Sequence, residues 1–215
     1  SPLKKCSTGY CMEQLVIGSE GTLGIITQVT LKLQPLPPYK IDMLAIFHDQ
    51  MAAIGVVPQL VKAGIDPTSI EYMDNPNVRT TSEYLEFPGA PHIEDGIYVI
   101  ITIETFNEDE LDVKMEQARD ICEAAGAVDV LEADERIWSM RRNCLESVSL
   151  ISKVCTTDDV VVPVDEMSDM IQYIIKTVAK YPFPLRINAH IGDGNLHIVL
   201  CKLDLSDEEW ESELS

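Results

Sequence analysis

Apolar and polar residues follow two periods along this chain, and each period predicts a different kind of element. Apolar runs of about four to eight residues between turn signals are typical of buried strands. Apolar residues spaced three and four apart are typical of helices with one buried face. The predicted strands span residues 24–33, 43–47, 69–73, 98–104, 128–131, 160–164, 185–189 and 198–202, and the predicted helices span residues 49–63, 75–85, 107–125, 134–150 and 166–180.

Turn residues give the ends of several helices. Asp49 precedes the helix of residues 49–63 as an N-cap, Gly64 follows it, and Pro58 inside it predicts a kink. The clearest helix is 107–125, whose apolar face is followed by Gly126. That face consists of Leu111, Met115, Ala118 and Cys122.

A proline-rich segment divides the chain. Residues 34–38 read Gln-Pro-Leu-Pro-Pro, and prolines at this density make a stiff, extended linker. We therefore expect one unit over residues 1–36 and a second over residues 37–215. The second unit alternates short strands with helices and has no glycine-rich phosphate loop between them. This pattern predicts an α+β fold, with one mainly antiparallel sheet and helices packed on one face.

Composition narrows the possible partners. Apolar residues make up 46% of the 215 positions, which is enough for a substantial core. The net charge of −20 makes a nucleic-acid or anionic-lipid partner unfavourable, whereas a small anionic substrate would need a local basic pocket.

Cysteine usage suggests a cellular compartment for this protein, and the two ends of the sequence suggest its extent. The six cysteines include no CxxC pair, which favours reduced thiols and a cytoplasmic location. No apolar run reaches the roughly 20 residues of a spanning helix, so we expect no integral membrane segment. The abrupt start at Ser1 and the polar segment 203–215 lead us to expect a piece of a longer protein.

The segment 188–197 holds the strongest candidate chemistry. His190 and His197 stand on either side of a turn that contains Gly192 and Gly194, between two predicted strands. Two imidazoles at one end of a hairpin can share a metal ion, or hold and deprotonate a small polar substrate. Zinc or manganese would need a third protein ligand, usually a carboxylate. Two unrelated surface histidines are the alternative.

Other motifs are weaker. Residues 18–24 carry three glycines but form neither a Walker loop nor a dinucleotide fingerprint, so they are either a ligand-binding or a structural turn. Arg141, close to Trp138 in a predicted helix, could fork onto a carboxylate, or could simply be solvated or paired with Glu135 or Glu146. Nothing in the sequence supplies a base for a nucleophilic Cys155.

These motifs resemble one flavoprotein family. Thr8-Gly9-Tyr10 and Gly18-Ser19-Glu20-Gly21-Thr22-Leu23-Gly24-Ile25-Ile26 are similar to the end of the FAD-binding domain in FAD-linked oxidases of the vanillyl-alcohol-oxidase type. The hairpin 190–197, and Trp138 with Arg141, resemble the branch of D-lactate dehydrogenases, D-2-hydroxyglutarate dehydrogenases and glycolate oxidases. The three motifs occur in the family's order and cover essentially the whole chain.

The resemblance implies a fold, cofactors and roles. Residues 1–36 would be the C-terminal remnant of the FAD-binding domain, and residues 37–215 a truncated, ferredoxin-like cap domain over the flavin. His190 and His197 would bind a divalent metal, zinc or manganese, that orients a 2-hydroxy acid, and Arg141 would hold its carboxylate. An electron-transfer flavoprotein or a quinone would accept the electrons. The FAD contacts would come from Gly18, Ser19, Glu20, Gly21, Thr22, Gly24 and Ile25.

Departures from the family pattern leave alternatives open. The family's FAD diphosphate loop would lie before Ser1, and its third metal ligand, a glutamate in a Glu-His-Gly motif, beyond residue 215. Thr157 and Val199 stand where hydroxyglutarate enzymes carry Lys and Asn, which favours D-lactate or glycolate as the substrate. A stand-alone metal-binding or interaction module is one alternative. A metal-dependent hydrolase is another, but no HExxH spacing supports it.

Overall fold

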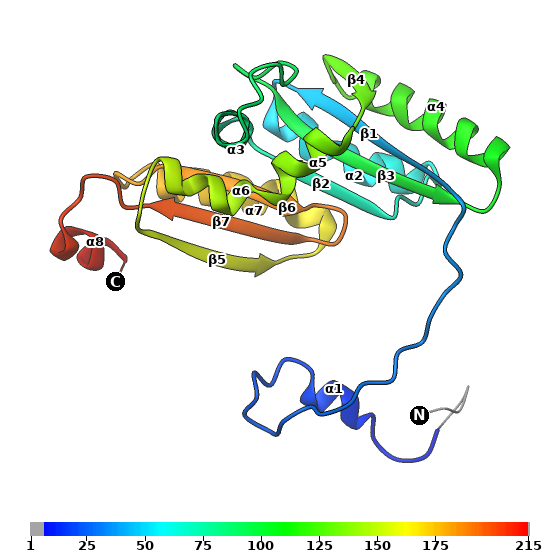
Figure 1. Ribbon diagram of the computed structural model, residues 1–215, viewed down its shortest axis with the longest axis horizontal. Coiled ribbons are helices and arrows are strands. Elements are labelled where there is room, and N and C mark those ends of the chain that lie inside the picture. The colour runs from blue at the N-terminus through cyan, green and yellow to red at the C-terminus, as the bar shows by residue number, and fades with distance from the viewer. Residues whose placement is uncertain (1–6, 215) are drawn as a thin grey trace. The chain divides into compact units, whose positions relative to one another are not determined.

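The computed structural model describes residues 7–214, and the chain divides into two compact units between Leu36 and Pro37 (Figure 1). In the first unit the regular element is a short helix, α1 (Met12–Val16). The strand expected over residues 24–33 does not form, because residues 7–36 offer no second strand to pair with its backbone.

The second unit is built on one sheet of seven antiparallel strands in the order β4-β1-β3-β2-β6-β7-β5 (Figure 1). The expected α+β fold with a mainly antiparallel sheet is confirmed. The strands are β1 (Tyr39–Phe47), β2 (Ser69–Met73), β3 (Ile97–Thr105), β4 (Asp129–Glu132), β5 (Cys155–Val161), β6 (Leu185–His190) and β7 (Asn195–Cys201).

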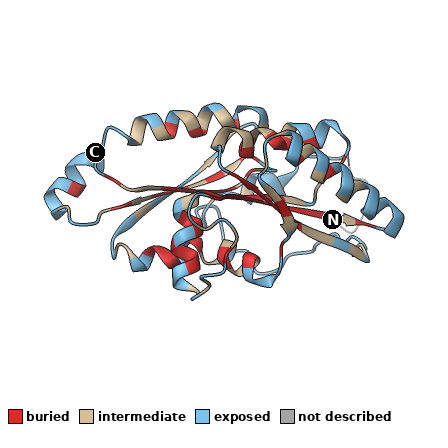
Figure 2. Cartoon of the chain, turned by 90° about the horizontal axis from the view of Figure 1, so that it is seen from above, coloured by how far each residue is buried: buried red, intermediate tan, exposed pale blue. Residues whose placement is uncertain are grey.

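Helices cover both faces of this sheet (Figure 2). Met43, Ala45 and Phe47 of β1 join the core beneath α2 (Gln50–Lys62), α4 (Glu108–Ala124) and α7 (Met167–Val178). The alternate residues Leu44 and Ile46 join a second core with α3 (Asn75–Tyr84), α5 (Glu135–Arg142) and α6 (Cys144–Ser147). The expectation of helices on one face therefore describes only half of the packing. A last helix, α8 (Asp207–Leu214), follows the sheet.

Side-chain caps fix the helix starts where the sequence predicts them. The Asp49 carboxylate accepts a hydrogen bond from the Ala52 amide at 2.7 Å, and the Asn107 side chain accepts one from the Asp109 amide at 2.9 Å. Gly64 and Gly126 follow the two helix ends with φ of 75° and 102°, a region that favours glycine.

Two boundaries differ from expectation. The helix expected over residues 134–150 is interrupted at Asn143, whose φ of −102° and ψ of 17° leave helical geometry. A 3-10 turn, Val148–Leu150, follows α6. The strand expected over residues 160–164 instead covers Cys155–Val161. It is an edge strand that pairs only with β7, so polar residues occupy positions that an apolar run cannot predict.

Candidate active site

The turn between β6 and β7 brings His190 and His197 together. Their ring centroids lie 5.1 Å apart at an interplanar angle of 83°. Gly194 makes the turn possible, because its φ is 86° and a Cβ there would lie 2.1 Å from the carbonyl oxygen of Val162. The Asp193 carboxylate accepts a hydrogen bond from the Asn195 amide at 3.2 Å, which closes the loop.

A carboxylate holds each imidazole through the same ring nitrogen. His190 Nδ1 lies 2.7 Å from Glu71 Oε2, and His197 Nδ1 lies 2.6 Å from Asp159 Oδ1. This pairing fixes the orientation of each ring. Nε2 is the ring nitrogen that the carboxylate does not contact. Metal-binding histidines commonly have this carboxylate support on the nitrogen that faces away from the metal. The donor chemistry of the pair therefore fits a divalent cation such as zinc or manganese.

Glu71, which the sequence pattern alone does not single out, connects this pair to Arg141. The same oxygen, Oε2, lies 2.8 Å from Arg141 Nη2, and both side chains are about nine-tenths buried. Glu71 stands on β2 directly opposite His190 of β6. The sequence feature that could have identified Glu71 is that it is a single carboxylate inside the short apolar strand Ser69–Met73. Of the partners considered for the two arginines, Glu135 pairs with the neighbouring Arg142, not with Arg141.

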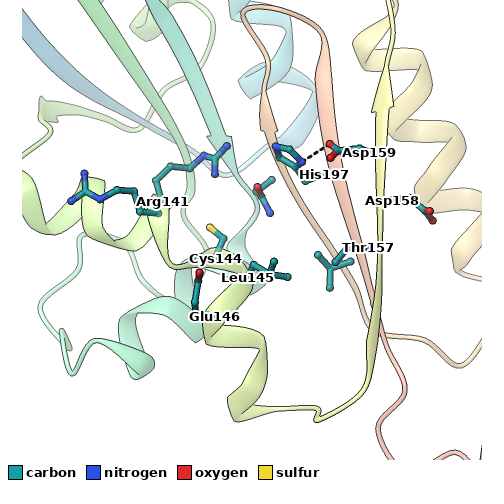
Figure 3. Close-up of a pocket in the computed structure, with 11 residues that line it drawn as sticks. Arg141, Cys144, Leu145, Glu146, Thr157, Asp158, Asp159 and His197 are labelled. Carbon is teal, nitrogen blue, oxygen red and sulfur yellow. Dashed lines mark ion pairs between the residues drawn. The ribbon is translucent and has the colours of Figure 1, made fainter. Parts of the chain in front are cut away.

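Arg141 and His197 line one cavity of 390 Å³ (Figure 3). Figure 3 shows Thr157 and Asp159 on the cavity side of β5, whereas Asp158 points the other way. The Nε group of Arg141 is buried and has no hydrogen-bond partner among residues 7–214. A buried guanidinium with an unused donor beside a cavity is suited to bind a carboxylate. The cavity is also lined by Arg142, Cys144, Leu145, Glu146, Asn188 and Val199.

The cysteines near this site are poor nucleophiles. Burial raises the pKa of the Cys144 thiol to about 12, so it remains protonated at neutral pH. Cys155 is exposed at the start of β5, where it stands opposite Cys201 and not opposite His197. Neither residue has the surroundings of a thiolate nucleophile.

The metal ligand set is incomplete in the described residues. Within residues 7–214, His190 and His197 do not form a group of three ligand atoms within 4.8 Å of one another with any cysteine or carboxylate. Two carboxylates nevertheless line the cavity with His197, and their field favours a cation. They are Glu146 and Asp159.

The glycine loop of residues 18–24 belongs to the first unit and forms a tight turn. Gly18 and Gly21 have φ of 80° and 78°, and no atom lies within 4 Å of a Cβ built at either position. The Thr22 amide and hydroxyl donate to the Ser19 carbonyl at 2.9 and 2.6 Å. Such an open backbone allows close approach of a ligand, which is compatible with part of an FAD-binding site. Its contact with FAD stays a prediction.

Fold and site together define an α+β domain with a small, charged ligand pocket at the end of a histidine hairpin. Residues 36–214 match the family described as "FAD linked oxidases, C-terminal domain". The chain belongs to this family, which confirms the resemblance drawn from its motifs.

Curated relatives agree with this assignment. The chain is 33% identical to D-lactate dehydrogenase of Anaerostipes hadrus over 99% of this chain and 47% of that protein. It is 32% identical to glycolate oxidase subunit GlcD of Bacillus subtilis over 96% of this chain and 44% of that protein. The chain thus spans just under half the length of these relatives.

Solved structures show the same fold. An alkyldihydroxyacetonephosphate synthase matches with a TM-score of 0.68 at 18% identity, covering 98% of this chain and 46% of that one. A p-cresol methylhydroxylase with substrate bound matches with a TM-score of 0.61 at 12% identity, covering 84% and 42%. No helix in residues 7–214 is long and apolar enough to span a membrane.

Proposed function

We propose that this chain forms the substrate-binding half of an FAD-dependent D-2-hydroxyacid dehydrogenase that oxidises D-lactate or glycolate to the 2-oxo acid. One observation carries the proposal. The buried guanidinium of Arg141, with an unused Nε donor, lines the same cavity as the carboxylate-supported His197. A 2-hydroxy acid has a carboxylate and a neighbouring hydroxyl, which match these two kinds of group.

Arg141 binds the substrate carboxylate in this proposal. Glu71 holds the guanidinium through Nη2, and Nε has no hydrogen-bond partner among residues 7–214. A planar, pre-oriented guanidinium binds a carboxylate through two hydrogen bonds at a small loss of side-chain freedom. Oε2 of Glu71 also contacts His190. Glu71 therefore fixes the position of Arg141, which binds the carboxylate in this proposal, relative to His190.

His190 and His197 hold the divalent cation through their Nε2 atoms. The bound cation supplies Lewis acidity, which lowers the pKa of a substrate hydroxyl. Glu71 and Asp159 keep both rings in the tautomer that leaves Nε2 unprotonated.

FAD is the proposed cofactor, and it supplies the hydride acceptor. Gly18, Ser19, Glu20, Gly21, Thr22, Gly24 and Ile25 are the residues that would contact it, through an open backbone. An electron-transfer flavoprotein or a quinone is the proposed final acceptor. The relative from Bacillus subtilis is named as a subunit, which supports a multi-subunit arrangement.

The cavity favours a small substrate. Thr157 and Val199 line it and offer neither a cation nor an amide to a second carboxylate. Since hydroxyglutarate enzymes carry Lys and Asn at these two positions, Thr157 and Val199 support D-lactate or glycolate over hydroxyglutarate, whereas Arg142 and Asn188 supply a cation and an amide elsewhere in the lining. The free thiols of the cysteines in residues 7–214 support a reducing, cytoplasmic compartment.

Two arginines of helix α5 provide the first test of the proposal. In the complete flavoenzyme, Arg141→Lys replaces the planar fork by a point charge and should raise the KM for D-lactate about 100-fold. Arg136→Lys is the matched control, because Arg136 is exposed, pairs with Asp134 and does not line the cavity. Its KM should change by less than about twofold. Steady-state kinetics with an artificial electron acceptor measure both values.

Two results would contradict this assignment. Equal effects of the two arginine substitutions would mean that Arg141 does not bind the substrate. No turnover of D-lactate or glycolate by wild-type enzyme containing FAD would remove the proposed substrates themselves. Binding of oxalate, a non-reacting dicarboxylate probe, to wild type and to Arg141→Lys gives a readout that does not depend on flavin chemistry.

A further inference from the structure

A second pair of histidines lies at the end of the sheet formed by β1, β3 and β4. His48 directly follows β1, and His92 lies in the loop before β3. Asp129, the first residue of β4, stands opposite Ile46 in the sheet register. Three neighbouring strands therefore place these groups together, although His48 and Asp129 are 81 residues apart in the sequence.

The side chains form a ligand cluster. One ligand atom each of His48, His92 and Asp95 lies within 4.8 Å of the other two. His48 Nε2 is 3.3 Å from Asp95 Oδ1, His92 Nε2 is 3.6 Å from Asp129 Oδ2, and the ring centroids are 5.9 Å apart. Among the described residues, these two carboxylates have no lysine or arginine ion-pair partner.

The loop that carries His92 and Asp95 is held in place. Asn75 Nδ2 donates to the carbonyls of Ile93 and Gly96, both at 3.1 Å. The Gly96 amide donates to the His92 carbonyl at 2.7 Å, and His92 itself has a left-handed φ of 47°. A Cβ at Gly96 would lie 2.6 Å from that carbonyl oxygen. The backbone beneath the cluster is therefore fixed by hydrogen bonds and close packing.

We propose that His48, His92 and Asp95 bind a divalent transition-metal ion of the zinc type, with Asp129 supporting His92. Two imidazoles and one carboxylate are a typical donor set for zinc with one open position. Ligand atoms around tetrahedral zinc are separated by roughly 3.4 Å, so the side chains need to close by at most about 1.4 Å. Rotation about the bonds of half-exposed side chains supplies a movement of this size.

Two of the three proposed ligands border a cavity. His48 and Asp95 line a space of 310 Å³, together with Gln50, Asn75 and Ile97. This space gives room for water or a small oxygen ligand beside the proposed ion. This site is distinct from the pair His190 and His197, since the two pairs lie on different strands, and it does not rest on the proposed oxidation of a hydroxy acid.

Calorimetric titration with zinc chloride tests the site in the whole chain. The double variant His190→Gln/His197→Gln removes the other histidine pair and should still bind one equivalent of zinc. Adding His92→Asn should weaken that binding at least about tenfold, and asparagine tolerates the left-handed backbone at this position. Adding Asp95→Asn instead should also weaken it.

Glu94→Gln is the matched control, because Glu94 is an exposed carboxylate in the same loop. It should change the affinity by less than about twofold. Cobalt(II) absorption provides a second readout, since a four-coordinate site gives intense visible bands that should disappear with His92→Asn. Failure of the double variant to bind zinc would overturn the proposal. So would an affinity that is unchanged by both His92→Asn and Asp95→Asn in correctly folded protein.

Discussion

The two histidine pairs of this chain have similar rings and very different support. We call His190 with His197 the inner pair and His48 with His92 the outer pair. Ring exposure is alike, at 42% and 30% for the inner pair and 46% and 36% for the outer pair. The closest nitrogen–carboxylate distances are 2.7 and 2.6 Å in the inner pair but 3.3 and 3.6 Å in the outer pair.

The clearest difference lies behind His190. Its partner Glu71 is only 10% exposed and contacts the equally buried Arg141. The carboxylates beside the other three rings, Asp159, Asp95 and Asp129, are 69%, 62% and 41% exposed. A buried carboxylate is costly to desolvate and persists only with good partners. One ring of the inner pair is therefore pre-organised by a buried ion pair, a support that the outer pair lacks. Ring exposure alone does not reveal how firmly a site is held.

The largest expected effect is that of removing the buried carboxylate. Glu71→Ala leaves Arg141 buried without its partner and should lower the free energy of unfolding by about 3–5 kcal/mol. The same change in the outer pair, Asp95→Ala, should cost less than about 1 kcal/mol, because Asp95 is solvated. Urea unfolding of both variants measures the contrast, and equal losses would show that the two pairs are supported alike.

Glycines in the two turns give a second contrast. Gly194→Ala combines a positive φ with a 2.1 Å contact to a carbonyl oxygen and should cost about 3 kcal/mol. Gly126→Ala is the control, because its φ of 102° is also positive but its Cβ would meet no atom within 4 Å. It should cost about 1 kcal/mol. Similar unfolding free energies for the two variants would show that the Gly194 turn relaxes freely.

A buried carboxyl at the end of β2 predicts a pH dependence. Asp74 Oδ2 accepts a hydrogen bond from the Ile187 amide of β6 at 2.6 Å, and burial raises the pKa of Asp74 from 3.8 to about 6. The native state therefore binds the proton more tightly than the unfolded chain. This contribution to stability is fully present below about pH 4 and is lost as the pH rises through 6.

Asp74→Asn isolates this effect. The free energy of unfolding of wild type relative to Asp74→Asn should fall by about 2–3 kcal/mol between pH 4 and pH 7. Urea unfolding at several pH values measures the difference, since other titrating groups cancel between the two proteins. A difference that is constant with pH, or that increases, would contradict the raised pKa.

Elements are predictable from the sequence where local signals decide them. Asp49 and Asn107 cap helices, and Gly194 allows the turn that brings His190 and His197 together. The unbroken apolar run Met43–Phe47 also carries the signal for a strand buried on both faces. The prediction of helices on one face is therefore too narrow, because this run requires a covering layer on each side of the sheet.

Long-range partners cannot be predicted from local sequence patterns. Glu71 and His190 are 119 positions apart, and no local pattern shows that β2 and β6 are neighbours. Asp159 lies before the predicted strand, because an edge strand such as β5 needs no apolar run. Topology, not periodicity, selects these supporting carboxylates.

The sheet has a narrow seam, and the contact between Glu71 and His190 crosses it. Strands β2 and β6 share three register pairs, whereas β1 and β3 share nine. On one side of the seam lies the four-stranded part made by residues 39–132, and on the other the three-stranded part made by residues 155–201. Glu71 and His190 form one of the three seam pairs. Any fluctuation that separates the two parts of the sheet therefore also separates Glu71 from His190, so the contact between these two residues reports that the two parts of the sheet have come together.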